Sequence, residues 1–507
     1  MRSPTDPGLI AGRPAARGQR DTVIAVKNAL KLGGSLVLTW GIAVVIRLVM
    51  PRYLGPDAWG PLNFSDAFTT TFFVALSLGV DTYIRREVSV RPGHASEFLG
   101  GITLIRVLST VVLLGVMQVV MLVTGRAPAV QVLVYVYGFA CFATAMNMTF
   151  AALLHAQGTV DELSALNIVS KVVWAAGTFL ALVLRWPLVA IPGALLLSET
   201  LKLVVSARLV QKHLQVRWRL DGAAVKVALL ASLPMFLNTA AHTIYNKLDV
   251  SILAVVAGDR EVAWYGAASL LAGLTLIIAP MIGWVLMPLF AKARSRSEDE
   301  YTSILRRSLE LVLSFAIPSS LFMAMGAELW VSLLYGERYA PAAASLRLLS
   351  PLFVLTYVAM LNAHSLILTG RAWSQAFISI GGVIVNPLLN WLFVPPAMRW
   401  FGLGGAGRGA ACAQLGTELI VTAAMMRLVG MRAFDRRTLA MLLKTAAVCL
   451  VVWLLDGWLV PRLQPIARLL IDFGVYAALL LLSGAVRVRE TIDFARTSLV
   501  RAERSSP

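Results

Sequence analysis

Long apolar segments follow one another along the chain, separated by short polar loops. A helix that crosses the hydrocarbon core of a bilayer needs about 20 apolar residues, and segments of this length recur throughout the sequence. We predict membrane helices at residues 31–50, 60–84, 100–124, 130–155, 164–184, 187–209, 224–257, 262–290, 305–325, 342–368, 374–394, 404–426, 439–458 and 466–486. The predicted fold is therefore an all-α polytopic membrane protein with about 14 transmembrane helices.

The charged residues give this pattern an orientation. Only 14% of the 507 residues are charged and 58% are hydrophobic, which excludes a soluble domain, yet the net charge is +18. Alternate loops, counted with both termini, hold about 30 of the 45 Lys and Arg residues, against about 10 in the other loops. The positive-inside rule then places the basic loops and both termini in the cytoplasm, facing anionic membrane lipids, and nucleic acid is not an expected partner.

An internal repeat divides the predicted helices. The turn at residues 54–60 (LGPDAWG) is echoed at residues 257–266 (AGDREVAWYG), and helices in the two halves end at Gly158 and Gly370. The paired glycines are about 210 residues apart in both cases, and transporters are often built from such repeats around a central substrate site. We predict a flexible basic tail at residues 1–30, six-helix bundles at 31–222 and 223–430, two additional helices at 431–486 and a cytoplasmic tail at 487–507.

Several basic residues lie inside the predicted helices, where charge is costly and usually marks a pathway or a binding site. They are Arg47, Arg106, Lys171, Lys202 and Lys247. Arg47 and Arg106 lie near helix ends and can alternatively reach the membrane surface, and Lys202 can pair with Glu199 three residues earlier. Lys247 lies almost opposite the polar stripe of its own helix, so we assign it no role.

Polar residues recur at one helical phase in several predicted helices, which indicates a polar cleft between the bundles. In the seventh helix, Asn238, His242, Tyr245 and Asp249 share one stripe, and the eleventh carries Asn386 and Asn390. Because desolvation makes protonation usable near neutral pH, the coupling or protonation candidates are Asp249, Asp81, Glu199 and His242. The alternatives are pairing with the basic residues above, a structural hydrogen bond for His242, and interhelical hydrogen bonding for the stripes.

The sequence lacks the motifs of several enzyme classes. It contains no G-x-x-x-x-G-K-[ST] phosphate loop, no H-E-x-x-H, no G-x-S-x-G and no His/Cys cluster with metal-ligand spacing. The longest predicted outside loop, residues 327–346, is too short for an external catalytic domain. We therefore predict a transporter and not an enzyme, without a cofactor or a metal.

Several short segments resemble the polysaccharide flippases of the multidrug/oligosaccharidyl-lipid/polysaccharide exporter superfamily. They are residues 52–60 (RYLGPDAWG), which follow Arg47, 246–250 (NKLDV), 264–268 (WYGAA), 334–342 (LYGERYAPA) and 401–407 (FGLGGAG). Their order and spacing extend over nearly the whole chain. The resemblance implies a MATE-like fold, with two pseudo-symmetric six-helix bundles around a central cavity and, in this chain, two further C-terminal helices.

The resemblance also implies a function. It implies a flippase of the bacterial inner membrane that moves a polyprenyl-pyrophosphate-linked oligosaccharide, of the undecaprenyl type, from the inner to the outer leaflet by alternating access. Such a protein serves exopolysaccharide, O-antigen or capsule synthesis, and a polysaccharide polymerase is a candidate partner. On this basis Arg47 and Lys171 would contact the pyrophosphate, with Arg106 and Lys202 next, while Asn386 and Asn390 would bind the glycan. Asp249 and Asp81 would be the coupling residues.

Other functions stay open at this point. A lipid II flippase shares the requirement for a basic cavity. A drug or cation antiporter of the same superfamily would be expected to have an acidic and aromatic cavity instead. A membrane glycosyltransferase, polymerase or ligase would need a larger outer loop, and a structural scaffold would leave the intramembrane charges unexplained.

Overall fold

The computed structural model describes residues 14–276, 279–430, 436–460 and 463–484, whose regular secondary structure is helical. The elements are α1 (Pro14–Phe73), η1 (Val74–Ser77), α2 (Val80–Val90), η2 (Pro92–His94), α3 (Ala95–Val123), α4 (Pro128–Ala156), α5 (Val160–Val183), α6 (Ala190–Leu214), α7 (Gly222–Val256), α8 (Asp259–Gly273), η3 (Leu274–Leu276), α9 (Ala279–Arg296), α10 (Glu298–Met325), α11 (Ala327–Tyr335), η4 (Glu337–Tyr339), α12 (Ala342–Leu349), α13 (Leu352–Leu368), α14 (Ala372–Phe401), α15 (Gly405–Val429), α16 (Arg436–Leu459) and α17 (Pro465–Leu482).

The number of membrane passes is close to the predicted fourteen. Twelve helices among the described residues are long and apolar enough to span a bilayer. The first of them, Val37–Ser77, reverses direction at Gly55 (φ 71°, ψ 171°), so that it provides two passes. The segment made by α8, η3 and α9 adds a further pass between α7 and α10.

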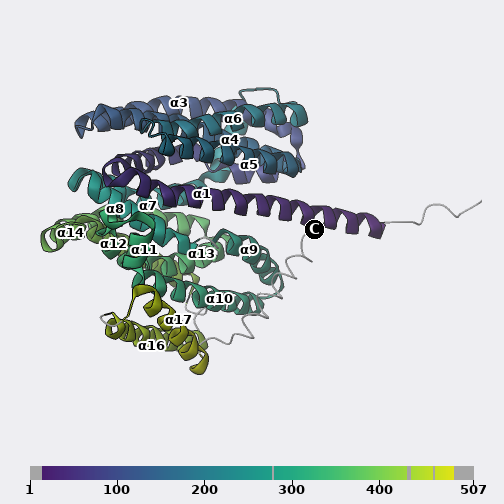
Figure 1. The fold of residues 1–507 in the computed structure, drawn as a ribbon. Helices are drawn as coiled ribbons and strands as arrows, with labels where there is room; N and C mark the ends of the chain where they lie inside the picture. Colours follow the sequence, from purple (N-terminus) through teal and green to yellow (C-terminus); the bar gives the residue numbers. More distant parts are fainter. Residues whose placement is uncertain (1–13, 277–278, 431–435, 461–462, 485–507) are drawn as a thin grey trace, which may run out of the picture.

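The helices form two groups, with α1 and α7 lying between them (Figure 1). In one group, α3 to α6 pack on one another and on α1, and in the other, α8 to α15 pack together and on α7. The hairpin of α16 and α17 lies at the edge of the second group, against α10. We call α1–α6 the N-terminal helices and α7–α15 the C-terminal helices. We call the end of the helix bundle where α1 reverses and α8 begins the Gly55 end. The opposite end of the bundle is the Gly158 end.

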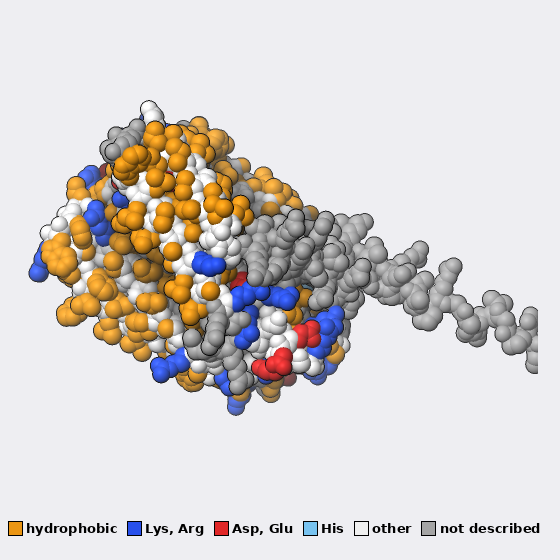
Figure 2. All heavy atoms as spheres, turned by 90° about the horizontal axis from the view of Figure 1, so that it is seen from below, with side chains coloured by type: hydrophobic (Ala, Val, Ile, Leu, Met, Phe, Trp, Pro, Cys, Tyr) orange, Lys and Arg blue, Asp and Glu red, His pale blue; other side chains and the backbone are white. Residues whose placement is uncertain are grey.

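The surface is suited to a lipid environment. Apolar side chains cover most of the face shown in Figure 2, and the acidic side chains visible there gather toward the Gly158 end with many of the basic ones. Large exposed hydrophobic residues lie along the spans, among them Val111, Val123, Trp391 and Leu454. A soluble protein would not expose so extensive an apolar surface, whereas a bilayer covers it.

Three predicted boundaries differ from the observed ones. Residues 14–30, predicted as part of a flexible tail, are the start of α1, since a nucleated helix extends readily through Ala, Leu and Lys. The predicted loop at 327–346 contains the helix α11, and the predicted helix at 60–84 is broken between Phe73 and Val80 by η1 and a left-handed pair, Leu78 (φ 51°) and Gly79 (φ 66°). The predicted tail at 487–507 lies outside the described residues.

The two groups of helices are held together at the Gly55 end. Here α1 packs on α8 so closely that a Cβ atom at Gly60 would lie 2.0 Å from the carbonyl oxygen of Asp259. Polar contacts cross the same interface: Arg126–Asp259 at 3.0 Å, Arg260–Asp57 at 2.6 Å, Arg52 Nη1 to the Leu333 carbonyl at 2.7 Å and Tyr339 Oη to the Pro51 carbonyl at 2.9 Å. A single hydrophobic core continues through this contact from one group to the other.

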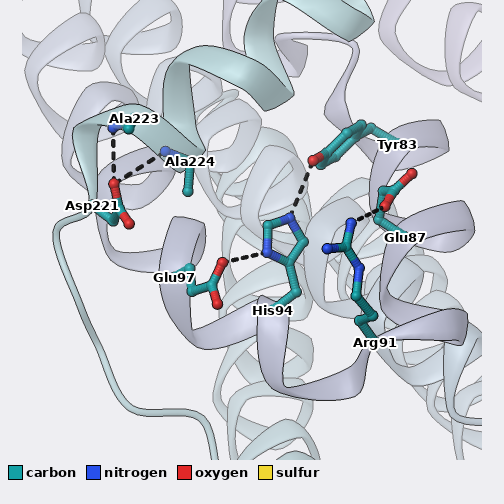
Figure 3. Close-up of polar contacts among 8 residues, drawn as sticks. All are labelled: Tyr83, Glu87, Arg91, His94, Glu97, Asp221, Ala223 and Ala224. Atoms are coloured by element: carbon teal, nitrogen blue, oxygen red, sulfur yellow. Dashed lines mark hydrogen bonds and ion pairs between the residues drawn. The ribbon is translucent and has the colours of Figure 1, made fainter.

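The Gly158 end has its own polar contacts, one set between α2 and α3 and another within the first turn of α7 (Figure 3). The His94 imidazole lies between Tyr83 Oη, at 3.1 Å, and the Glu97 carboxylate, at 2.5 Å. Asp221 Oδ1 accepts hydrogen bonds from the backbone N–H groups of Ala223 and Ala224, which caps α7. The first set fixes the turn between α2 and α3, and the second fixes the start of α7.

Candidate functional site

Three of the predicted basic residues share one site on the N-terminal helices. Lys171 on α5 lies within electrostatic range of Arg47 on α1 and of Lys202 and Glu199 on α6. Its ammonium group is also 4.5 Å from the centre of the Trp174 ring, which is a cation–π contact. We call Arg47, Lys171 and Lys202 the basic cluster.

Glu199 provides only part of the counter-charge for this cluster. Its Oε2 accepts a hydrogen bond of 2.8 Å from Asn147 Nδ2, and its backbone carbonyl accepts another of 2.9 Å from the same amide. One carboxylate beside three cations leaves the site with a net positive charge. Such a site attracts an anion, and it does so more strongly at low effective dielectric than in water.

The exposure of the basic cluster implies a water-filled cleft beside it. Arg47 is exposed and Lys171 and Lys202 are half-buried, although all three lie in helices that are long and apolar enough to span a bilayer. A charge exposed to hydrocarbon would be very costly, so these groups face a water-filled space. Across it, Lys247 Nζ on α7 lies 3.8 Å from Asp66 Oδ2 on α1, and both side chains are about one-third exposed. This ion pair joins the N-terminal and C-terminal helices.

A second polar site lies in the C-terminal helices around Asp249. This residue is fully buried, and its carboxylate accepts hydrogen bonds from Tyr265 Oη (2.8 Å), Asn386 Nδ2 (2.9 Å) and Asn390 Nδ2 (2.7 Å). Asn386 and Asn390, predicted as glycan contacts, are themselves fully buried. In this conformation they are inaccessible to a substrate and hold the Asp249 carboxylate in place.

Hydrogen bonds connect Asp249 to the cleft. Asn386 donates to Gln414 Oε1 (3.0 Å), and Gln414 donates to Asn246 Oδ1 (2.7 Å). Asn246 contacts the exposed imidazole of His242 at 3.2 Å. Of the predicted coupling residues, the structure thus links Asp249 to His242 through three amide side chains.

Arg106 has a different environment from the basic cluster. It lies three turns inside α3 and is fully buried. Its Nε donates to the Leu76 carbonyl (2.8 Å), its Nη1 to Thr149 Oγ1 (2.6 Å) and its Nη2 to the Ser77 carbonyl (3.4 Å). These carbonyls belong to the break between α1 and α2, whose helical partners are lost. In this conformation Arg106 reaches neither a substrate nor the membrane surface, and it stabilises the broken helix.

Asp81, predicted as a coupling residue, belongs to the environment of Arg106. It accepts a hydrogen bond of 3.4 Å from Thr149 Oγ1, and the charges of Arg106 and Arg85 act on it. Thr149 therefore bridges the Asp81 carboxylate and the guanidinium of the intramembrane Arg106.

Sequence reasoning missed several residues of these sites. Lys247 lies on the face of α7 opposite the polar stripe, as predicted, but this face meets Asp66 on α1. A position away from the stripe is therefore no reason to assign Lys247 no role. Gln414 and the buried Glu418, which accepts from Tyr245 Oη at 3.2 Å, are polar residues within an apolar helix. That signal was available in the sequence, since buried polar groups in membrane helices need partners.

The fold is shared with solved membrane transporters. The chain is similar to an inward-facing multidrug resistance MATE family transporter of the MOP superfamily, with a TM-score of 0.65, 16% identity and coverage of 82% of this chain and 99% of that one. It is also similar to the lipid II flippase MurJ in an inward closed conformation, with a TM-score of 0.69, 13% identity and coverage of 91% and 99%. A mutant of the Vibrio cholerae MATE transporter VcmN gives a TM-score of 0.56 at 14% identity, with coverage of 82% and 100%. The fold is that of the MOP superfamily.

The family follows from the sequence. Residues 25–294, more than half of the chain, match the polysaccharide biosynthesis protein family, and the chain belongs to this family. The family and the MATE-like fold predicted from the sequence are thereby confirmed. No curated protein sequence matches the chain. The protein is a multi-pass membrane protein of the polysaccharide biosynthesis protein family, with a fold similar to that of MATE transporters and MurJ.

Proposed function

We propose that the protein is a flippase that moves a polyprenyl-pyrophosphate-linked oligosaccharide from the inner to the outer leaflet for polysaccharide synthesis. The observation that carries this proposal is the net positive site formed by Arg47, Lys171 and Lys202, whose exposure implies a water-filled cleft among the membrane-spanning helices. A diphosphate linkage is the anionic part of such a substrate, and Arg and Lys are its natural ligands. Membership of the polysaccharide biosynthesis protein family supports the glycan part.

The arrangement of the cleft supports transport by alternating access. The two groups of helices contact each other closely at the Gly55 end, where α1 meets α8, while Arg47 and His242 are exposed. The excess of basic residues in the loops at the Gly158 end assigns that end to the cytoplasm. The conformation is then inward-facing, and in it the basic cluster receives the headgroup from the inner leaflet of the bacterial inner membrane, with the polyprenyl chain left in lipid.

Ion coupling is proposed at Asp249. A carboxylate buried away from the basic cluster, with three hydrogen-bond donors and an amide chain to the cleft, is able to bind a proton or another cation without competing with the substrate. Binding there alters the packing of α7, α8 and α14, which carry the Asp249 contacts. Because α7 also carries Lys247, the change reaches the ion pair with Asp66.

The proposal is tested with purified protein in liposomes that contain a short polyprenyl-pyrophosphate oligosaccharide. An impermeant glycan-modifying enzyme added outside measures the fraction of glycan that reaches the outer leaflet, with and without a pH gradient. We expect Arg47→Gln and Lys171→Gln to lower transport about 10- to 100-fold, the loss of one charge-assisted hydrogen bond each. The matched control is Arg185→Gln, which removes an exposed arginine at the Gly55 end.

The same assay separates the competing functions. Transport of lipid II in preference to the oligosaccharide lipid would identify a cell-wall flippase. Export of an organic cation without any glycan exposure would identify a drug antiporter and would make the basic cluster structural. Unchanged glycan transport in both cluster variants, at normal protein levels, would refute the proposed binding site.

A further inference from the structure

The hairpin of α16 and α17 contains three buried charged residues that the proposed function does not use. Asp456 lies in the last turn of α16, Arg468 lies in the first turn of α17, and Asp472 follows Arg468 one turn later on the same face. Their exposed fractions are 9%, 8% and 0%, respectively. Charged side chains inside a membrane hairpin are costly, and they usually have both a partner and a role.

This group has too few hydrogen-bond donors. Arg468 Nε and Asp456 Oδ1 lie 2.9 Å apart as an ion pair, but neither atom makes a hydrogen bond with the described residues. Both carboxylate oxygens of Asp472 are buried without a partner, although the Asp456 carboxylate lies within hydrogen-bond reach. Two carboxylates can bond to each other only when one of them carries a hydrogen. The arrangement therefore lacks one donor between Asp456 and Asp472.

The charges of the group are also unbalanced. With both carboxylates ionised, one guanidinium leaves a net charge of −1. The surroundings do not compensate for it, because α10 carries no charged residue from 311 to 325 and the other titratable side chains packed in this hairpin are those of Cys449 and Tyr476. An uncompensated charge in an apolar core costs a large amount of free energy. One additional positive charge would make the group neutral.

A metal cation fits this position less well than a proton. Hard cations take about six or more oxygen ligands, and here only two side chains offer carboxylate oxygens. The described residues contain no group of three or more His, Cys, Asp or Glu side chains that could hold a metal ion. The Arg468 guanidinium beside Asp456 would also repel a metal cation. A proton needs no ligand shell, and it supplies the missing donor as well as the missing charge.

The group lies close to the Gly55 end of the bundle. A Cβ atom at Gly326, where α11 begins, would lie 3.0 Å from Leu469 Cδ1 on α17, and α11 contacts Arg52 at the Gly55 end. Asp456 is three residues from the end of α16, and the side chains of Asp456 and Arg468 keep 12% and 9% of their surface exposed. A proton from the medium at the Gly55 end can reach Asp472 through these two side chains.

We propose that the hairpin of α16 and α17 contains a proton-binding site, in which Asp472 holds one proton and donates a hydrogen bond to Asp456. Asp456 stays ionised and paired with Arg468, so the group is neutral. Loss of the proton leaves two adjacent carboxylates beside one guanidinium in the core between the hairpin and α10. The packing of the hairpin on α10 consequently weakens as the pH at the Gly55 end rises.

Infrared difference spectra of the full chain in nanodiscs test for the proton directly, because a protonated carboxyl group and a carboxylate absorb in separate bands. At neutral pH, the spectrum of the wild type minus that of Asp472→Asn should contain one carboxylic acid band. Asp456→Asn should lose the same band, because Asp472 then ionises and pairs with Arg468. Arg468→Gln should gain a second band, because both carboxyl groups then hold a proton.

Unfolding in mixed micelles at several pH values measures the linked proton. The folded protein holds a proton that the unfolded chain releases above pH about 5, so rising pH favours unfolding. The unfolding constant of the wild type should therefore increase about tenfold more per pH unit than that of Asp472→Asn, until the folded protein also loses the proton. Asp299→Asn, at an exposed carboxylate on α10, is the control and should keep the wild-type pH dependence.

Equal pH dependence of unfolding in the wild type and Asp472→Asn would overturn the proposal, and so would an acid band that neither Asp472→Asn nor Asp456→Asn removes. Asp472→Asn keeps the shape of the protonated residue, and Asp456→Asn provides the same infrared test if the first variant proves unstable. Stabilisation by sodium ions that Asp472→Asn abolishes, without an acid band in the wild type, would overturn the proposal in favour of a metal cation.

Discussion

Replacing Arg106 by Met should destabilise the protein far more than the loss of any exposed arginine. The substitution keeps an apolar stem of similar length but removes the donors to the Leu76 and Ser77 carbonyls. Each buried acceptor left without a partner costs about 1–3 kcal/mol. Asp81 also loses the positive charge beside it. The expected decrease in the free energy of unfolding is therefore about 3–5 kcal/mol, as for other buried charges that lose their partner.

Reversible unfolding in mixed micelles, followed by far-UV circular dichroism as the fraction of denaturing detergent increases, measures this decrease. Arg106→Lys keeps the charge but lacks the planar guanidinium that reaches three separate acceptors. It should therefore lower the free energy of unfolding less than Arg106→Met does, but still below that of the wild type. Adding Asp81→Asn to Arg106→Met should cost less than the sum of the two single changes, because the uncompensated carboxylate is then absent. A decrease below about 1 kcal/mol for Arg106→Met would refute the role assigned to this residue.

Three further predictions concern the interface between the two groups, the contact of α8 with α15 and the second polar site. Gly60→Ala should shift the protein away from the conformation closed at the Gly55 end, because its Cβ would lie 2.0 Å from the Asp259 carbonyl oxygen. Spin-label distances across this end measure the shift. Gly41→Ala is the control, because a Cβ at Gly41 has nothing within 4 Å. Glu261→Ala should lower the free energy of unfolding by about 2–3 kcal/mol, because the carboxylate accepts two backbone N–H groups at the start of α15, at 2.6 and 3.1 Å. Asp249→Asn should remove the effect of a pH gradient on transport while binding of the lipid substrate, measured by equilibrium titration, stays unchanged.

Much of the architecture was predictable because the bilayer imposes a helix length. The range at 224–257 agrees with α7 to within a few residues, and the range at 342–368 is occupied by α12 and α13 together. The break after Phe73 was not predictable from local sequence, since Leu78 and Gly79 lie in a run that reads as an uninterrupted apolar helix. Its stability depends on donors from Arg106, which is 30 residues away from Leu76 and on another helix.

The candidate site was predictable as a set of residue types but not as a set of positions. Intramembrane charge marked Arg47, Lys171 and Lys202, and the structure brings Arg47 and Lys202 within electrostatic range of Lys171. The same rule marked Arg106. It cannot distinguish an arginine in a cleft from one that is buried among hydrogen-bond acceptors, because both environments stabilise the charge. The partner that each helical face meets decides the matter, and a single helix carries no information about its neighbours.

The burial of Arg106 also bears on how the chain enters the membrane during synthesis. An arginine at the centre of an isolated helix opposes insertion by about 2.5–3.5 kcal/mol. Thr149 is made only later, on α4, whereas the carbonyls of Leu76 and Ser77 precede α3 in the chain. Two of the acceptors for Arg106 are thus already present when α3 leaves the translocon. Insertion of α3 therefore depends on the segment synthesised before it, and a variant that closes the break after Phe73 into a regular helix would impair biogenesis before it impaired transport.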